Sequence, residues 1–152
     1  MKLLAIRAVM RMFSWITPRA AEYLAPPLAA VVWYSVPRLR RVTRVNLKAV
    51  YPEMDEKQRK KIGRASMTNY VRGVFEAGML WHWPLERMYA LFDEVQGLEQ
   101  VEELISKGKG LIVAAPHYGS WEMLNLYLHS KGEAAILYKP SKHPDLDACL
   151  LY

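Results

Sequence analysis

The chain has 152 residues, of which 52% are hydrophobic and 11% aromatic, and its formal net charge is +6. This composition excludes an intrinsically disordered protein, and the length suffices for one domain of ordinary size. The single cysteine, Cys149, excludes an internal disulfide and fits a reducing compartment.

The charge is unevenly distributed along the chain. Residues 1–64 contain 14 Lys and Arg against 4 Asp and Glu, a net charge of +10. Residues 65–152 contain 7 against 11, a net charge of −4. A basic N-terminal portion of this kind is compatible with nucleic acid, anionic lipid or an acidic carrier protein, and composition leaves that choice open.

The first 36 residues have the character of a membrane anchor. Residues 2–17 predict an apolar helix with Arg7 and Arg11 one turn apart, which is typical of a helix in the membrane interface. Residues 23–37 carry no charge, but Pro26 and Pro27 interrupt them, and a spanning helix needs about 20 apolar residues. We therefore expect residues 1–36 to be embedded in or to lie on a membrane; the alternative is a pair of core helices.

Helical patterns continue through most of the chain. Residues 37–50 predict a short basic amphipathic helix, and Asp55 is suited to cap a long helix that reaches about His82. In the long helix Ile62, Tyr70 and Val74 recur at helical spacing and predict its packed face. Further helices are expected at 85–92, 98–107 and 120–131, with strands at 111–115 and 134–138.

The most informative segment follows the apolar run 110–116. That run, bounded by Gly and Pro, predicts a buried parallel strand, and ligands bind at the carboxyl end of such strands. His117 stands at that end, separated by four residues from Glu122. A histidine with a carboxylate to fix its tautomer is suited to take a proton from a hydroxyl nucleophile.

The spacing of this pair also predicts local geometry. In an uninterrupted helix, residues five positions apart are rotated by about 140°, so the two side chains meet only if His117 precedes the helix. Pro116 and Gly119 favour a bend there, and Ser120 is a suitable N-cap. Glu122 would then lie in the first helical turn, near the positive end of the helix dipole.

The motif His-Tyr-Gly-Ser-Trp-Glu after a hydrophobic strand resembles the lipid A biosynthesis (late) acyltransferases, the lauroyl and myristoyl transferases of Gram-negative bacteria. They belong to the wider His-x4-Asp/Glu acyltransferase group. Matches on both sides of the motif extend the resemblance over nearly the whole chain. They are the basic segment 38–47, Tyr51-Pro52-Glu53, Glu76, Tyr138-Lys139-Pro140 and Pro144-Asp145-Leu146.

Three departures from the family pattern stand out. Ser120 replaces a common Asn, and Lys139 replaces an Arg, which removes bidentate recognition of a phosphate or carboxylate. The family's later arginine- and glycine-bearing motifs have no counterpart here. We therefore expect residues 37–152 to be the N-terminal part of the acyltransferase domain, from a truncated gene or a fragment.

The resemblance implies an α/β fold. N-terminal membrane-associated helices would be followed by the start of a parallel sheet, an incomplete glycerolipid-acyltransferase-like fold. A sheet of two parallel strands is not a stable endpoint, because parallel sheets need both faces covered.

The resemblance also implies transfer of a fatty acyl chain from acyl carrier protein to a hydroxyl of a lipid A precursor, in lipopolysaccharide biosynthesis. The reaction would take place at the cytoplasmic face of the inner membrane. His117 would be the general base and Glu122 would orient it and stabilise its imidazolium form. Substrate-binding positions would be Gly119, Ser120, Trp121 and Lys139. The expected partners are the acyl carrier protein, a phosphorylated glycolipid and the membrane, but not nucleic acid, and we expect no metal or organic cofactor.

Other interpretations of the same residues remain. The chain could be an inactive membrane-binding fragment, or it could acylate another glycolipid or a lysophospholipid. His117 and Glu122 could form a structural hydrogen bond. A nucleophilic Ser120 lacks the Gly-x-Ser-x-Gly context. A zinc site would have to use residues whose spacings match no familiar pattern, namely His117, Glu122, His129, His143 and Cys149.

Overall fold

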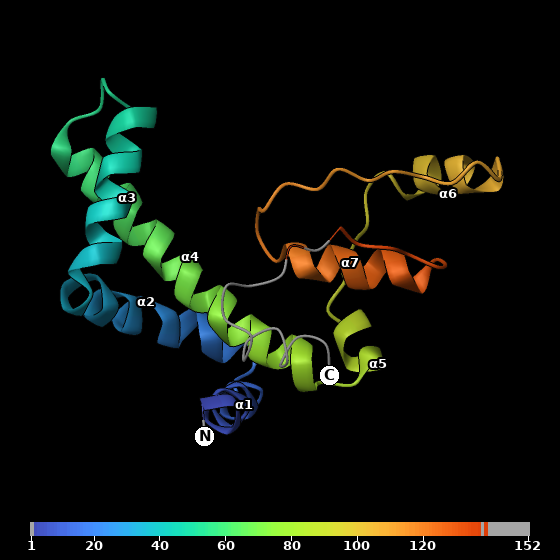
Figure 1. Ribbon diagram of the computed structural model, residues 1–152, viewed down its shortest axis with the longest axis horizontal. Helices are drawn as coiled ribbons and strands as arrows, with labels where there is room; N and C mark the ends of the chain where they lie inside the picture. The colour runs from blue at the N-terminus through green and yellow to red at the C-terminus, as the bar shows by residue number, and fades with distance from the viewer. Residues whose placement is uncertain (1, 138, 140–152) are drawn as a thin grey trace. The chain divides into compact units, whose positions relative to one another are not determined.

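The computed structural model describes residues 2–137 and 139, and their secondary structure is helical (Figure 1). The helices are α1 (Lys2–Phe13), α2 (Pro18–Ser35), α3 (Pro37–Val50), α4 (Glu56–His82), α5 (Leu85–Tyr89), α6 (Leu98–Ser106) and α7 (Trp121–Ser130). The described chain divides into two compact units, with the boundary in the sequence between His82 and Trp83. The first contains α1 to α4, and the second, Trp83–Lys139, contains α5 to α7.

The predicted helices are confirmed, with shifts at their ends. The first ends at Phe13, where Ser14 turns the chain and its hydroxyl donates to the carbonyl of Arg11. The second continues through Pro26 and Pro27, which the sequence analysis expected to interrupt it. Its first turn is capped by Thr17, whose hydroxyl oxygen accepts from the N–H of Ala20. Among the described residues, no helix combines the length and apolar character that crossing a membrane requires.

The first unit is built around α4, which packs against α1, α2 and α3. One stripe of α2 is buried at four-residue spacing: Ala21, Ala25, Ala29 and Trp33. A stripe of larger side chains on α4 is buried in the same way: Met67, Val71, Phe75 and Met79. Small side chains on one helix and large ones on the other let the two axes approach closely while the space between them is filled.

Two glycines of α4 mark where its neighbours come closest. A Cβ added at Gly78 would lie 2.5 Å from Cβ of Phe13 and 2.8 Å from the carbonyl oxygen of Met10. A Cβ at Gly63 would lie 2.8 Å from the Trp33 ring. Near Gly78, the Phe13 and Phe75 rings meet edge to face with centroids 5.2 Å apart. The backbone of α1 therefore rests directly on α4.

The packed face predicted for α4 is wrong. Tyr70 is 60% exposed, and neither Ile62 nor Val74 is fully buried. The buried stripe instead passes through Met67 and Phe75 and includes Gly63 and Gly78. Apolar residues occur on more than one side of α4, so helical periodicity alone does not identify the buried face.

The turn between α3 and α4 is fixed by two sets of hydrogen bonds. Asp55 and Gln58 form a reciprocal capping box: the Asp55 carboxylate accepts from the Gln58 N–H at 2.7 Å, and the Gln58 side chain accepts from the Asp55 N–H at 3.1 Å. The Arg59 guanidinium donates to the carbonyls of Tyr51, Pro52 and Met54. A single side chain of α4, that of Arg59, thus holds the backbone of the turn after α3 in place.

The second unit differs most from prediction. Residues 111–115 and 134–137 form no strand in the described structure, and Tyr138 lies outside the described residues. Ile112 and Leu137 are 98% and 105% exposed instead of buried. A parallel strand depends on neighbours that cover both of its faces, and the described residues provide none for these segments.

The predicted functional boundary between residues 36 and 37 stays a prediction. In the structure α2 and α3 are separated by Val36 alone, and both pack against α4 within the first unit. The anchor-like segment and the basic helix are therefore parts of one compact body.

The close approach at Gly78 predicts opposite effects of two glycine substitutions in α4. Gly78→Ala should lower the free energy of unfolding by about 1–3 kcal/mol, because backbone atoms of α1 must move. Gly73→Ala should raise it by about 0.5–1 kcal/mol, because its added Cβ meets nothing within 4 Å and alanine favours the helix. Urea unfolding followed by circular dichroism measures both values. Equal effects of the two substitutions would contradict the α1–α4 contact.

Candidate active site

The segment before α7 forms a turn around His117. The N–H of Tyr118 donates to the carbonyl of Pro116 at 2.8 Å, which closes a three-residue turn with His117 at its centre. Gly119 follows with φ of +59°, in the left-handed region that glycine enters at little cost. His117 therefore precedes the helix, as the spacing of the motif predicted.

The first turn of α7 carries the rest of the motif. Ser120 occupies the N-cap position, and its carbonyl accepts from the N–H of Met123 at 3.0 Å, although its hydroxyl makes no capping bond. Glu122 lies in this first turn and is half-buried. The N–H groups of a first turn have no acceptor within their own helix, so they create a positive potential beside these residues.

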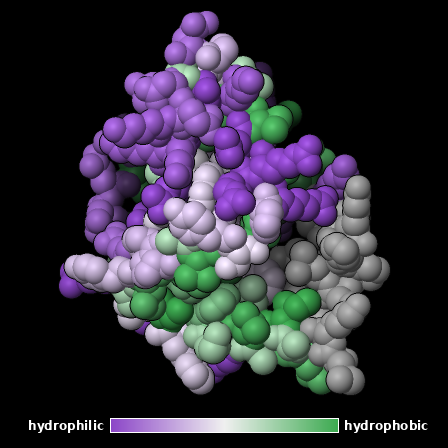
Figure 2. All heavy atoms as spheres, turned by 90° about the vertical axis from the view of Figure 1, so that its left-hand side faces the viewer, coloured by the Kyte–Doolittle hydropathy of each residue, from purple (hydrophilic) through white to green (hydrophobic). Residues whose placement is uncertain are grey.

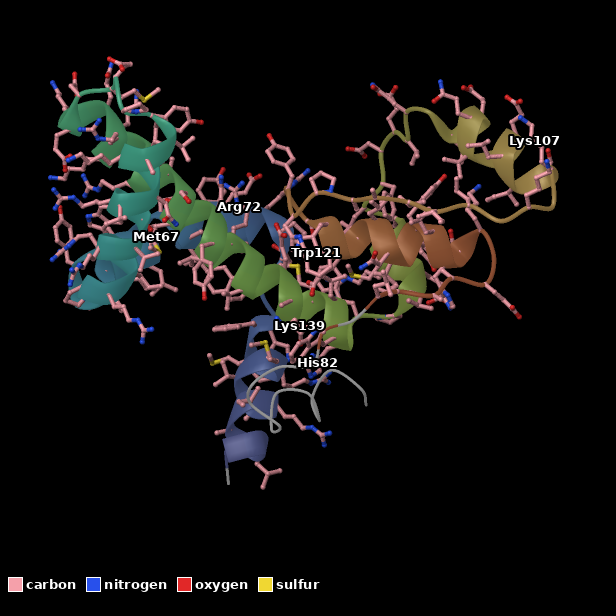
Figure 3. The ribbon with its side chains drawn as sticks, turned by 45° about the horizontal axis from the view of Figure 1, so that its top comes forward. Met67, Arg72, His82, Lys107, Trp121 and Lys139 are labelled. Carbon is pink, nitrogen blue, oxygen red and sulfur yellow. The ribbon has the colours of Figure 1, made fainter. Side chains whose placement is uncertain are left out.

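The structure brings the rings of His117 and Trp121 together. Their centroids are 4.7 Å apart and their planes are inclined by 49°. Trp121, at the start of α7 (Figure 3), thus packs against the imidazole in a tilted arrangement. Sequence reasoning assigned Trp121 to substrate binding and missed this contact. Its signal is the position of the indole directly after the N-cap, one turn beyond the bend.

The other residues predicted to bind substrate are Gly119, Ser120 and Lys139. Gly119 and Ser120 form the connection between His117 and Trp121, and both are exposed. Lys139 is exposed and belongs to the same unit as α7. The matched positions Tyr138, Pro140 and 144–146 lie outside the described residues. The roles predicted for these residues stay predictions.

The zinc interpretation gains nothing from the structure. Within the described residues, no three His, Cys, Asp or Glu side chains lie close enough to hold a metal ion. His143 and Cys149 lie outside those residues.

Contacts further along α7 fix it within its unit. The ring of Tyr127 packs on that of Phe92 with centroids 5.3 Å apart, and the Tyr89 hydroxyl donates to the carbonyl of Leu126 at 3.5 Å. Lys131, just past the helix end, pairs with Glu102 of α6 at 3.2 Å. The C-terminal part of α7 is thus held by contacts with the rest of its unit, whereas its N-terminal turn carries the motif.

The geometry has a clear chemical meaning. An exposed imidazole packs at a tilt against an indole, and the N-terminus of a helix lies directly after it. Such a group is accessible to a substrate hydroxyl, and negative charge that develops nearby is stabilised by the first-turn N–H groups.

A comparison with known proteins agrees with the motif. The profile of the family described as bacterial lipid A biosynthesis acyltransferase matches residues 4–151. The chain belongs to this family. No solved structure gives a significant match to it.

Curated relatives include enzymes from two bacteria. The chain is 26% identical over 110 residues to the lipid A biosynthesis lauroyltransferase of Escherichia coli K12, covering 72% of this chain and 36% of that protein. It is 26% identical over 101 residues to the palmitoleoyltransferase of the same organism, covering 66% and 33%. It is 27% identical over 112 residues to a lipid A biosynthesis acyltransferase of Haemophilus influenzae, covering 72% and 34%. The chain therefore spans about a third of the length of these relatives.

The ring contact between His117 and Trp121 predicts a spectroscopic change. Trp121→Leu should move the NMR signals of the His117 ring protons toward those of a free imidazole, because the indole ring current is lost. The ring signals of His129, in the last turn of the same helix, serve as the control and should stay in place. Unchanged His117 signals would contradict the contact.

The pair between Lys131 and Glu102 predicts a pH dependence. The hydrogen bond from the Lys131 ammonium to the Glu102 carboxylate raises the pKa of Lys131 above its ordinary value of 10.5. A raised pKa means that the stabilisation is complete below 10.5 and is lost as pH rises through the higher folded value. Urea midpoints of the chain and of Glu102→Gln should therefore differ at neutral pH and converge in strongly alkaline solution. A difference that persists there would contradict the pairing.

Proposed function

We propose that this chain contributes the proton-transfer site of an acyltransferase that acts in lipid A biosynthesis. The acyl donor would be the thioester of acyl carrier protein, and the acceptor a hydroxyl of a phosphorylated lipid A precursor. The observation that carries the proposal is the accessible His117 at the start of α7, within a chain of this family.

In the proposed reaction His117 is the general base. Its free ring nitrogen takes the proton of the acceptor hydroxyl while that oxygen attacks the thioester carbonyl carbon. The tetrahedral intermediate then collapses: the carbon–sulfur bond breaks, and the protonated imidazole returns the proton to the leaving thiolate. The new ester and the free carrier thiol account for all atoms.

The neighbouring residues have supporting roles in this proposal. Trp121 holds the plane of the imidazole, and Glu122, in the adjacent first turn, orients His117 and favours its protonated form. The first-turn N–H groups of α7 are suited to stabilise the oxyanion. Gly119, Ser120 and Lys139 would contact the substrates, and no metal or organic cofactor takes part.

The proposed place of the reaction is the cytoplasmic face of the inner membrane. Exposed large side chains of α1, of α2 and of the turn between them support this, since Leu4 is 71%, Tyr23 80% and Trp15, in that turn, 75% exposed. They would lie among the lipid chains of one leaflet, with the two helices in the plane of the interface. Carrier protein would approach from the aqueous side.

Substitution of the base tests the proposal. The chain is incubated with an acyl carrier thioester and a lipid A precursor, and the acylated product is measured. His117→Ala should lower the rate by about 10²–10⁴-fold, which is the usual contribution of positioned proton transfer. His129→Ala, which removes the exposed histidine at the other end of α7, should leave the rate unchanged.

Each other outcome has a definite meaning. Transfer at the normal rate by His117→Ala would contradict the base assignment. No product from a folded chain that still binds lipid vesicles would favour a membrane-binding fragment without catalysis. Faster acylation of a lysophospholipid than of the lipid A precursor would identify a different acceptor.

A further inference from the structure

A groove in the first unit gathers an unusual number of cations. It lies between α3 and the start of α4 and has a volume of about 510 Å³, within the size range of small-ligand sites. Its charged lining residues are Arg40, Arg41, Arg44, Lys48, Arg59 and a single carboxylate, Glu56. The groove is therefore strongly positive, and an anion is the ligand that fits it.

Two of these cations are available to an anion. Within the described part of the chain, no ion pair or hydrogen bond engages the charged group of Arg41 or of Lys48. They lie seven residues apart, two turns of α3, so they point to the same side at a spacing of about 10 Å. Arg44 lies between them and pairs with Glu56 at 2.6 Å.

Other lining cations help to build the groove. Arg59 holds the turn after α3 through backbone carbonyls, and its Nε lies 3.7 Å from the Glu56 carboxylate. Arg40 donates to the carbonyl of Trp33 at 3.4 Å, at the C-terminal end of α2. The walls are thus held in place by contacts that leave Arg41 and Lys48 unused.

The helix that precedes α3 has an apolar exposed surface. On α2 the exposed side chains include Tyr23, Leu24, Leu28 and Val31, at 80%, 47%, 40% and 59% exposure. Figure 2 shows hydrophilic side chains gathered over the upper part of one face and hydrophobic side chains below them. Only Val36 separates α2 from α3, so the basic helix follows the apolar helix directly.

We propose that this groove binds the phosphate of an anionic lipid headgroup while the adjacent face of α2 contacts the lipid chains. Arginine recognises phosphate by paired hydrogen bonds, and a basic segment beside an apolar face is the arrangement that a charged bilayer surface favours. An acidic protein helix would match the cations but would leave the apolar face exposed to water. The inference goes beyond the proposed acyl transfer and does not require it.

Without lipid, Glu56 occupies one of the cations of the groove. Its carboxylate neutralises Arg44 and therefore competes with an entering phosphate for the same guanidinium. The ion pair is exposed, with 55% and 57% of the two side chains accessible, so it is cheap to exchange. Phosphate binding would transfer Arg44 from the carboxylate to the ligand.

Vesicle binding tests the site. The chain is mixed with vesicles of phosphatidylcholine alone or with added phosphatidylglycerol, and sedimented protein is measured. The double variant Arg41→Gln/Lys48→Gln should bind the anionic vesicles about 30-fold more weakly, which corresponds to about 1 kcal/mol for each cation. Arg38→Gln/Lys57→Gln removes the same charge from exposed positions that do not line the groove and should weaken binding less than the first double variant does.

A second variant should act in the opposite direction. Glu56→Gln frees Arg44 and should strengthen binding to the anionic vesicles, whereas Glu53→Gln, the same change outside the groove, should have a smaller effect. Circular dichroism verifies that each variant keeps its helices. An increase for Glu56→Gln with an unchanged circular dichroism spectrum is not caused by unfolding, so this variant keeps the test valid even if the double variant is unstable.

Several results would overturn the proposal. Equal losses in the two double variants would mean diffuse attraction by net charge. Equal binding to neutral and anionic vesicles would remove the role of the headgroup. Displacement of the chain from vesicles by millimolar inorganic phosphate would indicate a site for free phosphate, and displacement by an acidic helical peptide would indicate a protein partner. Loss of vesicle binding by a folded His117→Ala variant would also contradict the proposal, because the groove does not use His117.

Discussion

The packing of α4 against α1 and α2 is the constraint on which the first unit depends. Alanines of α2 face large side chains of α4, and Gly78 lets the backbone of α1 touch the same helix. Because buried side chains fill that space at near-crystalline density, the helices are held in one arrangement. Both α2 and α3 pack against α4, and this packing fixes the position of the apolar surface of α2 relative to the cationic groove.

Helices were predictable because their signals are local. Asp55 and Gln58 have the spacing of a capping box, and the structure forms it. The packed face of α4 was not predictable from periodicity, because this helix has apolar residues on more than one side. Tyr70 is exposed to solvent whereas Met67 and Phe75 are buried, because the neighbouring helices cover one side of α4. Strand formation at 111–115 and 134–138 likewise depends on distant partners, so local composition could not decide it.

In the candidate site, too, the features that depend on adjacent residues could be predicted from the sequence, and the contacts between side chains could not. The bend at Gly119, the N-cap position of Ser120 and the place of Glu122 in the first turn all follow from adjacent residues. The ring contact of Trp121 with His117 depends on how the turn orients two side chains, so it needed coordinates. The basic residues of α3 were visible in the sequence. The contributions of Glu56 and Arg59 to the groove could be recognised only from the contact between α3 and α4 in the structure.

The two prolines inside α2 bear on how far this helix can enter a lipid layer. Proline has no N–H, so the carbonyl oxygens of Glu22 and Tyr23 lose the donors that Pro26 and Pro27 would otherwise supply four residues later. A carbonyl oxygen without a donor is costly in hydrocarbon but is readily hydrated among the headgroups. In the proposed membrane arrangement the paired prolines would therefore limit the depth of α2, because they favour keeping these two carbonyls within reach of water.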